Sequence, residues 1–103
     1  MAWLNVTEFA TPFTTRSAGM PMVRGPKTAQ NNVAIGVSSA KSAAFNAATG
    51  VIRVETDAIC CIEISSDPTA IVLGATMTMR MVAGQTEYFY VTPGHKIAVI
   101  AST

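Results

Sequence analysis

Two stretches decide the fold of this chain: SAAFNAATGVIRVETDAICCIEISSDPTA at residues 42–70 and MRMVAGQTEYFYVTPGHKIAVIAS at residues 79–102. In both, apolar and polar side chains alternate over short runs that are separated by Gly, Pro, Asp and Ser. Alternation with a period of two is typical of half-buried β-strands, and the separating residues are typical of turns. Together they predict an all-β protein, a small jelly-roll-like β-sandwich.

The alternation also places the individual strands. We expect strands at residues 2–9, 32–37, 51–56, 58–65, 77–81, 85–91 and 96–102, with a short one around Phe45. Thr56-Asp57 should form a tight turn that makes 51–56 and 58–65 a hairpin, and Pro93-Gly94 should form a type II turn. The run 58–65 is apolar on both faces, so we expect its second face to be covered by a loop or by another subunit.

Residues 10–32 break this pattern. Residues 10–32 contain three prolines and no acid, and proline disfavours regular structure in the residues around it. We therefore expect residues 1–32 to form an N-terminal strand and an irregular arm, and residues 33–103 to form the β-sandwich domain. The apolar side chains of the arm would become ordered against a neighbouring molecule.

Composition limits the classes of function. The chain has 103 residues, enough for one domain, and half of them are apolar, yet no run is long enough to cross a bilayer. A net charge of +1 argues against nucleic-acid binding, and the lack of a basic and apolar leader at the start predicts synthesis in a cytosol. Four cations and one acid precede residue 51, and three cations and five acids follow, which suits head-to-tail contact between copies, docking on an acidic neighbour, or simple scatter.

Few residues point to catalysis or metal binding. His95 is the only histidine and lies in the Pro-Gly turn, without a carboxylate close in sequence. Cys60 and Cys61 point to opposite sides of one strand, so both should be buried, although Cys61 could instead form a disulfide between subunits. The remaining carboxylates fall on expected wet faces or turns. We expect no enzymatic activity, no cofactor and no metal.

The methionine and tyrosine patterns leave alternatives open. Met77, Met79 and Met81 alternate on one expected strand face, and together with Met20 and Met22 they favour packing or partner contact over a Cu(I) site. In the sequence Tyr88-Phe89-Tyr90, Phe89 should enter the core. The two tyrosines would then cover the core, meet a partner or form a carbohydrate platform.

The two stretches that open this section also resemble a group of small proteins of tailed bacteriophages and prophages. The resemblance spans about residues 42–101 and rests on an SxAFNxAT start, a PTA turn, an M-R strand and an ending similar to TEYF-V-PG-KVAVI. It implies a minor virion component, and small β-sandwich proteins of this kind are often head decoration or cement proteins. The apolar segment at residues 71–76 is longer here than in that pattern.

The resemblance and the residues together lead to one expectation of function. The chain would be a capsid decoration protein on the virion surface, assembled in the host cytoplasm, that forms a dimer or trimer and braces adjacent subunits of the major capsid protein. The alternative is a receptor- or carbohydrate-binding module of a tail or head fibre. The expected contact residues are aromatic, basic or sulfur-containing: Trp3, Phe13, Arg16, Met20, Met22, Arg24, Lys27, Met77, Met79, Met81, Tyr88 and Tyr90.

Overall fold

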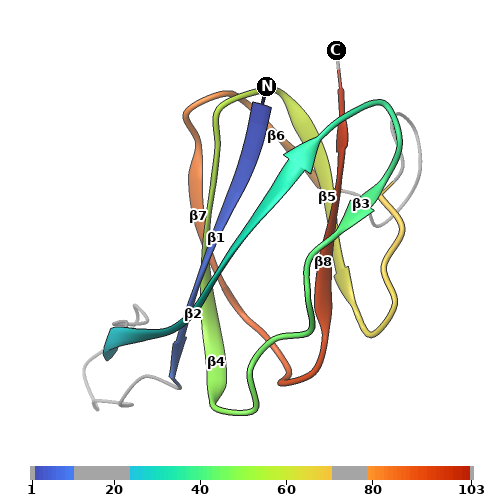
Figure 1. Ribbon diagram of the computed structural model, residues 1–103. Coiled ribbons are helices and arrows are strands. Elements are labelled where there is room, and N and C mark those ends of the chain that lie inside the picture. Colours follow the sequence, from blue (N-terminus) through green and yellow to red (C-terminus); the bar gives the residue numbers. More distant parts are fainter. Residues whose placement is uncertain (1, 11–23, 71–78, 103) are drawn as a thin grey trace.

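The protein consists of two antiparallel β-sheets packed face to face. The computed structural model describes residues 2–10, 24–70 and 79–102. Sheet A has the strand order β2-β1-β4-β7 and sheet B the order β3-β8-β5-β6 (Figure 1). The strands are β1 (Ala2–Ala10), β2 (Arg24–Ile35), β3 (Ala40–Lys41), β4 (Thr49–Thr56), β5 (Cys60–Ser65), β6 (Met79–Met81), β7 (Thr86–Tyr90) and β8 (Lys96–Ala101). The expected all-β class is confirmed.

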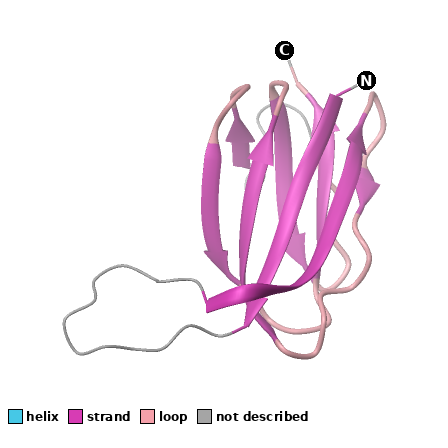
Figure 2. Cartoon of the chain, turned by 60° about the vertical axis from the view of Figure 1, so that its left-hand side comes forward, coloured by secondary structure: helices cyan, strands magenta, loops and turns pink. Residues whose placement is uncertain are grey.

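The chain changes sheet at most of its connections. Only the steps from β1 to β2 and from β5 to β6 stay within one sheet, and β1 lies in the interior of sheet A between β2 and β4. Figure 2 shows the strands of the two layers running in nearly the same direction, with connections at both ends. The finer expectation of a jelly roll is not confirmed by this arrangement.

Alternation along the strands builds the core between the sheets. In β1, Leu4 and Val6 point inward and are fully buried, whereas the intervening Asn5 lies on the outer side. The other strands obey the same rule, as expected from the period of two. The core cluster contains Leu4, Val6, Val33, Ile35, Phe45, Ile52, Val54, Cys60, Ile62, Met81, Ile97 and Val99.

The expected hairpin of residues 51–56 and 58–65 is wrong. β4 pairs with β1 and β7 in sheet A, whereas β5 pairs with β6 and β8 in sheet B. The turn between them is bent by Thr56, whose Oγ1 donates to the Ala58 carbonyl at 2.7 Å. Two strands joined by a tight turn can bury their apolar sides by facing each other across the core, and the alternation alone does not distinguish this from a hairpin.

The expected arm also ends earlier than predicted. β2 begins at Arg24 and pairs with β1 from Ala10 opposite Arg24 to Ala2 opposite Ile35, so the expected division at residue 32 falls inside a strand. β2 is an edge strand of sheet A. An edge strand tolerates a proline such as Pro26, because one side of its backbone needs no ladder hydrogen bonds. Residues 11–23, the remainder of the expected arm, lie outside the described part of the chain.

Two connections support each other at the end of the sandwich that contains Pro93-Gly94. The His95 N–H donates to the Thr92 carbonyl at 3.1 Å and Gly94 has a φ of 86°, which confirms the type II turn. Phe45, expected in a strand, instead lies in the connection from β3 to β4. It is buried, and its N–H donates to the His95 carbonyl at 2.8 Å. The side chain thus fills the core without a strand around it.

Glu8 corrects the expectation that the carboxylates lie on wet surfaces. It points into the sandwich from β1 and is 1% exposed. Its carboxyl oxygens accept hydrogen bonds from the Asn46 N–H at 2.8 Å, from Thr49 Oγ1 at 2.7 Å and from Asn31 Nδ2. Burial of a carboxyl group is tolerated only when donors of this kind replace water. Glu8 therefore ties β1 to β2, to β4 and to the connection that precedes β4.

Replacing Glu8 should reveal this role. We expect Glu8→Ala to lower the free energy of unfolding by about 2–4 kcal/mol, because it removes the acceptor of three hydrogen bonds and opens a cavity. Glu8→Gln should cost less, because its amide oxygen can still accept from Asn46 and Thr49. Urea denaturation measures both, and Glu63→Ala, a half-exposed site on sheet B, should change stability by less than about 0.5 kcal/mol. Equal effects at Glu8 and Glu63 would contradict this role.

The outer side of sheet B is covered along part of its width. The segment after β5 runs beside β3, where Lys41 Nζ contacts Asp67 Oδ1 at 2.5 Å and the Ala70 N–H donates to Ser39 Oγ at 3.0 Å. The hydrogen bond from Lys41, and its charge, hold the pKa of Asp67 below its usual range. The pair therefore supports the fold above the ordinary carboxyl pKa and loses its effect as the pH falls. These two contacts tie the connection after β5 to β3 and to the residue before it.

Both cysteines are buried, as expected. Cys60 points into the core with 0% exposure, and Cys61, on the outer side of β5, has 4%. Neither forms a disulfide, and the burial of Cys61 leaves it poorly placed for a bond to another subunit. Burial raises the pKa of the Cys60 thiol, and a hydrogen bond to Thr56 Oγ1 at 3.6 Å opposes part of that rise.

The thiols provide a test of this packing. Neither cysteine should react with Ellman's reagent in the folded protein, and both should react after denaturation in guanidinium. Because the folded-state pKa of Cys60 is raised, its contribution to stability is complete below about pH 8.5, the ordinary thiol pKa, and is lost as the pH rises further. The alkaline fall in the free energy of unfolding should thus be shallower in Cys60→Ala than in the parent protein. Rapid labelling of both thiols without denaturant would contradict the burial.

Candidate partner-binding face

The side of sheet A that points away from the core carries many polar and aromatic side chains. We call this surface the outer face of sheet A. The strand register places these side chains in rows across all four strands. One row contains Gln30, Thr7, Arg53 and Tyr88, and the next contains Asn32, Asn5, Glu55 and Thr86. Each side chain therefore has a neighbour on the adjacent strand at the distance where cross-strand pairs interact.

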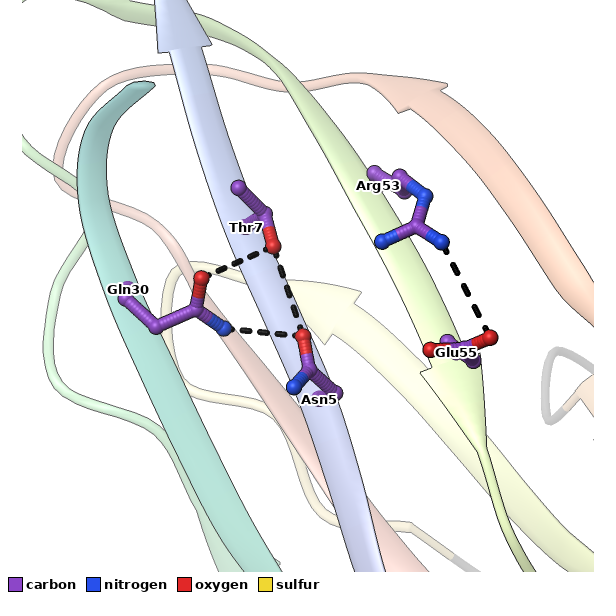
Figure 3. Close-up of polar contacts among 5 residues, drawn as sticks. All are labelled: Asn5, Thr7, Gln30, Arg53 and Glu55. Carbon is purple, nitrogen blue, oxygen red and sulfur yellow. Dashed lines mark hydrogen bonds and ion pairs between the residues drawn. The ribbon is translucent and has the colours of Figure 1, made fainter. Parts of the chain in front are cut away.

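Hydrogen bonds hold the centre of this face in place (Figure 3). Thr7 Oγ1 donates to Gln30 Oε1 at 2.9 Å, and Gln30 Nε2 donates to Asn5 Oδ1 at 2.8 Å and to the Val6 carbonyl at 3.1 Å. On β4, Arg53 Nη2 lies 3.7 Å from Glu55 Oε2. These bonds restrict the side-chain rotamers, so a partner that docks on the face does not have to order them.

Exposed aromatic rings lie at the β7 edge of the face. Tyr88 is 46% and Tyr90 65% exposed, both on the outer side, whereas Phe89 points inward and packs against the core as expected. Tyr90 stands opposite Val51, which in turn stands opposite Phe9. Phe9, Val51 and Tyr90 thus form one row next to Ala10, the residue at which β1 ends; within it Val51 is fully buried, Phe9 is half-buried and Tyr90 is exposed.

Adjacent residues of β7 provide a test of this orientation. Phe89→Ala should lower the free energy of unfolding by about 2–3 kcal/mol, less than a fully buried phenylalanine because Phe89 is half-buried. Tyr88→Ala and Tyr90→Ala should each change it by less than about 0.5 kcal/mol. Urea denaturation distinguishes the three variants. A large loss in either tyrosine variant would mean that its ring supports the fold rather than faces a partner.

The methionine prediction is partly wrong. Met79 is 45% exposed, but Met81 is fully buried in the core cluster and is not available to a partner. The two share one side of β6. Met81 lies opposite Cys60 in the middle of the sandwich, whereas Met79 lies opposite Ile62 at the open edge, beside Phe89. Two methionines on one side of the same strand thus differ in exposure, which the sequence pattern does not indicate.

The other expected contact residues divide into three groups. Trp3 is 45% exposed at the start of β1, close to the turn after β4. Arg24 and Lys27 lie in β2, and the structure does not describe their side chains. Four more expected residues in the arm, and one before β6, fall outside the described part of the chain: Phe13, Arg16, Met20, Met22 and Met77.

Sequence reasoning missed the polar part of the outer face of sheet A. Asn5, Thr7 and Gln30 were not singled out, because Gln30 was assigned to an irregular arm rather than to a strand. The alternation of Asn5 and Thr7 with Leu4 and Val6 was the available signal. Pairing of β1 with β2 is what brings the three side chains together.

Comparison of the chain with models of protein families, with curated proteins and with solved structures found no match. Within the described residues, no group of three or more His, Cys, Asp or Glu side chains is arranged to hold a metal ion. The same part of the chain contains no helix of the length and apolarity that spanning a membrane requires.

Proposed function

We propose that this chain is a capsid decoration protein of a tailed bacteriophage, which binds across adjacent subunits of the major capsid protein through the tyrosine end of the outer face of sheet A, the end near Ala10. The observation that supports this most directly is the set of exposed tyrosines beside a hydrogen-bonded polar surface. Tyrosine, tryptophan and arginine are enriched in protein interfaces, and Tyr88, Tyr90 and Arg53 stand together here. The virion location rests on the sequence resemblance of residues 42–101.

The end of the face that contains Tyr90 is where capsid contact would be strongest. Tyr90, 65% exposed, lies in the same row as Phe9, the residue before Ala10, and Ala10 pairs with Arg24. Residues 11–23 join these two positions and contain Phe13, Arg16, Met20 and Met22. By composition, this segment would add apolar side chains and a cation to the contact. A shell that binds many copies gains stability even when each contact is weak.

Capsid binding can be tested with empty heads assembled from the major capsid protein of the same genome. The parent protein should co-sediment with the heads in a saturable manner. The double variant Tyr88→Ala, Tyr90→Ala should bind at least about tenfold more weakly, the effect of losing about 1.4 kcal/mol. A second variant replaces residues 11–23 with Asn-Gly, which joins two antiparallel strands by a short turn and keeps β2 intact.

The control is Glu63→Ala on the outer side of sheet B, which should bind as the parent protein does. Circular dichroism and urea denaturation confirm that each variant is folded. Lack of parent binding to the heads, or unchanged binding of both the tyrosine and the 11–23 variants, would refute the proposed contact.

A further inference from the structure

A groove lies at the opposite end of sheet A from Ala10, where β1 begins and β4 ends. It is open to solvent, and its volume is about 580 Å³. Its lining combines an indole, an amide, two carboxyl groups and backbone from the β6–β7 turn: Trp3, Asn5, Glu55, Asp57, Ala83 and Gly84. Neither the core nor the tyrosine end of the face includes this site.

The walls of the groove are held together by hydrogen bonds between distant parts of the chain. The backbone N–H of Trp3 donates to Asp57 Oδ1 at 2.8 Å, and this bond joins the start of β1 to the turn after β4. The Gly84 N–H donates to the Thr56 carbonyl at 2.8 Å, which joins the β6–β7 turn to β4. Gly84 has a φ of 84°, a conformation that favours glycine and that brings the turn to this position. The groove is therefore formed before any ligand arrives.

The polar groups of the groove offer both acceptors and a donor. Asn5 Oδ1 already accepts from Gln30, and among the described residues the Asn5 Nδ2 group donates to no other protein atom, so it remains available to a ligand. The Glu55 and Asp57 carboxyl groups supply acceptors, and both residues are at least partly exposed. Beside them the indole of Trp3 is 45% exposed. An exposed ring next to a few fixed polar groups is the usual construction of a small-ligand site.

We propose that this groove binds a neutral pyranose, such as the terminal sugar of a glycan. One face of a pyranose ring is lined by C–H groups that can stack on the indole, and its hydroxyls both donate and accept hydrogen bonds. They would donate to Glu55 and Asp57 and accept from Asn5 Nδ2. Acidic sugars are disfavoured, because their carboxylate would face two carboxyl groups. Arg53 does not line the groove, but its Nη2 lies 3.7 Å from Glu55 Oε2 and offsets part of the negative charge there, which lessens the advantage of a cationic ligand.

This inference does not depend on the capsid proposal. Trp3 lies near the start of β1 and Tyr90 is level with Phe9 near its end, so the groove and the tyrosine end are separated along the strands. A copy that binds a capsid through the tyrosine end would keep the groove free. Glycan binding would then add attachment to a sugar-coated surface to the structural role.

Trp3 itself reports on the site, because it is the only tryptophan in the chain. Methyl glycosides of glucose, galactose, mannose and N-acetylglucosamine should be titrated while its fluorescence is followed, with saturation-transfer NMR as an independent readout. At least one neutral glycoside should bind saturably in the millimolar range. Methyl glucuronide and argininamide, tested at the same concentrations, should bind more weakly.

Variants identify the residues responsible. Trp3→Ala, followed by NMR, should abolish saturation transfer, and Glu55→Gln and Asn5→Ala should each weaken binding at least about threefold, as loss of a hydrogen bond predicts. Glu63→Gln is the matched carboxyl control on sheet B and should leave affinity unchanged. Circular dichroism checks that every variant is folded. If no neutral glycoside binds the folded parent protein, if glucuronide or argininamide binds better, or if the Glu55 and Glu63 variants behave alike, the proposal is wrong.

Discussion

The buried carboxyl group of Glu8 is the constraint on which one end of the sandwich depends. A carboxyl group removed from water is strongly destabilising unless donors replace the lost hydration. Here the donors come from β2, from the connection before β4 and from β4 itself, through Asn31, Asn46 and Thr49. The pairing of β1 with both neighbours shifts register just beyond Glu8. The positions of Ala10 and of the row beside it follow from this arrangement.

The outer side of sheet A differs from the outer side of sheet B. Both sheets alternate between an inner and an outer side, but only sheet B has a connection tied across it within the described residues, by Lys41 to Asp67 and by Ser39 to Ala70. Cys61, on the outer side of this sheet, is almost fully buried. Sheet A instead presents polar and aromatic side chains that are fixed by cross-strand hydrogen bonds, so the proposals place both binding surfaces there.

The two proposals assign different work to the two ends of the outer face of sheet A. Towards Ala10, the exposed tyrosine side chains suit a protein surface, where exclusion of water from apolar area drives association. Near Trp3, carboxyl groups, an amide and a single indole suit a small polar ligand with one apolar face. The hydrogen bonds of Asn5, Thr7 and Gln30 lie between these ends, and they hold both sites to the same rigid sheet.

The alternation in the sequence determined the class of fold, most strand positions and which side chains face the core. Ile97, Val99 and Phe89 point inward for this local reason, and the Pro93-Gly94 turn follows from the backbone preferences of the two residues. The tertiary structure alone decided which strands are neighbours. Alternation reports the side on which a residue lies, whereas pairing depends on contacts between positions far apart in the chain.

Those long-range contacts produced the features that the sequence did not predict. They placed β4 and β5 on opposite sides of the core, drew residues 24–32 into sheet A and enclosed Glu8 among donors. They also brought Trp3, Glu55 and Gly84 to one groove. No sequence motif identifies these residues, because the residues on either side of each one form a common strand or turn pattern. Only the packing of the two sheets gives them a common surface.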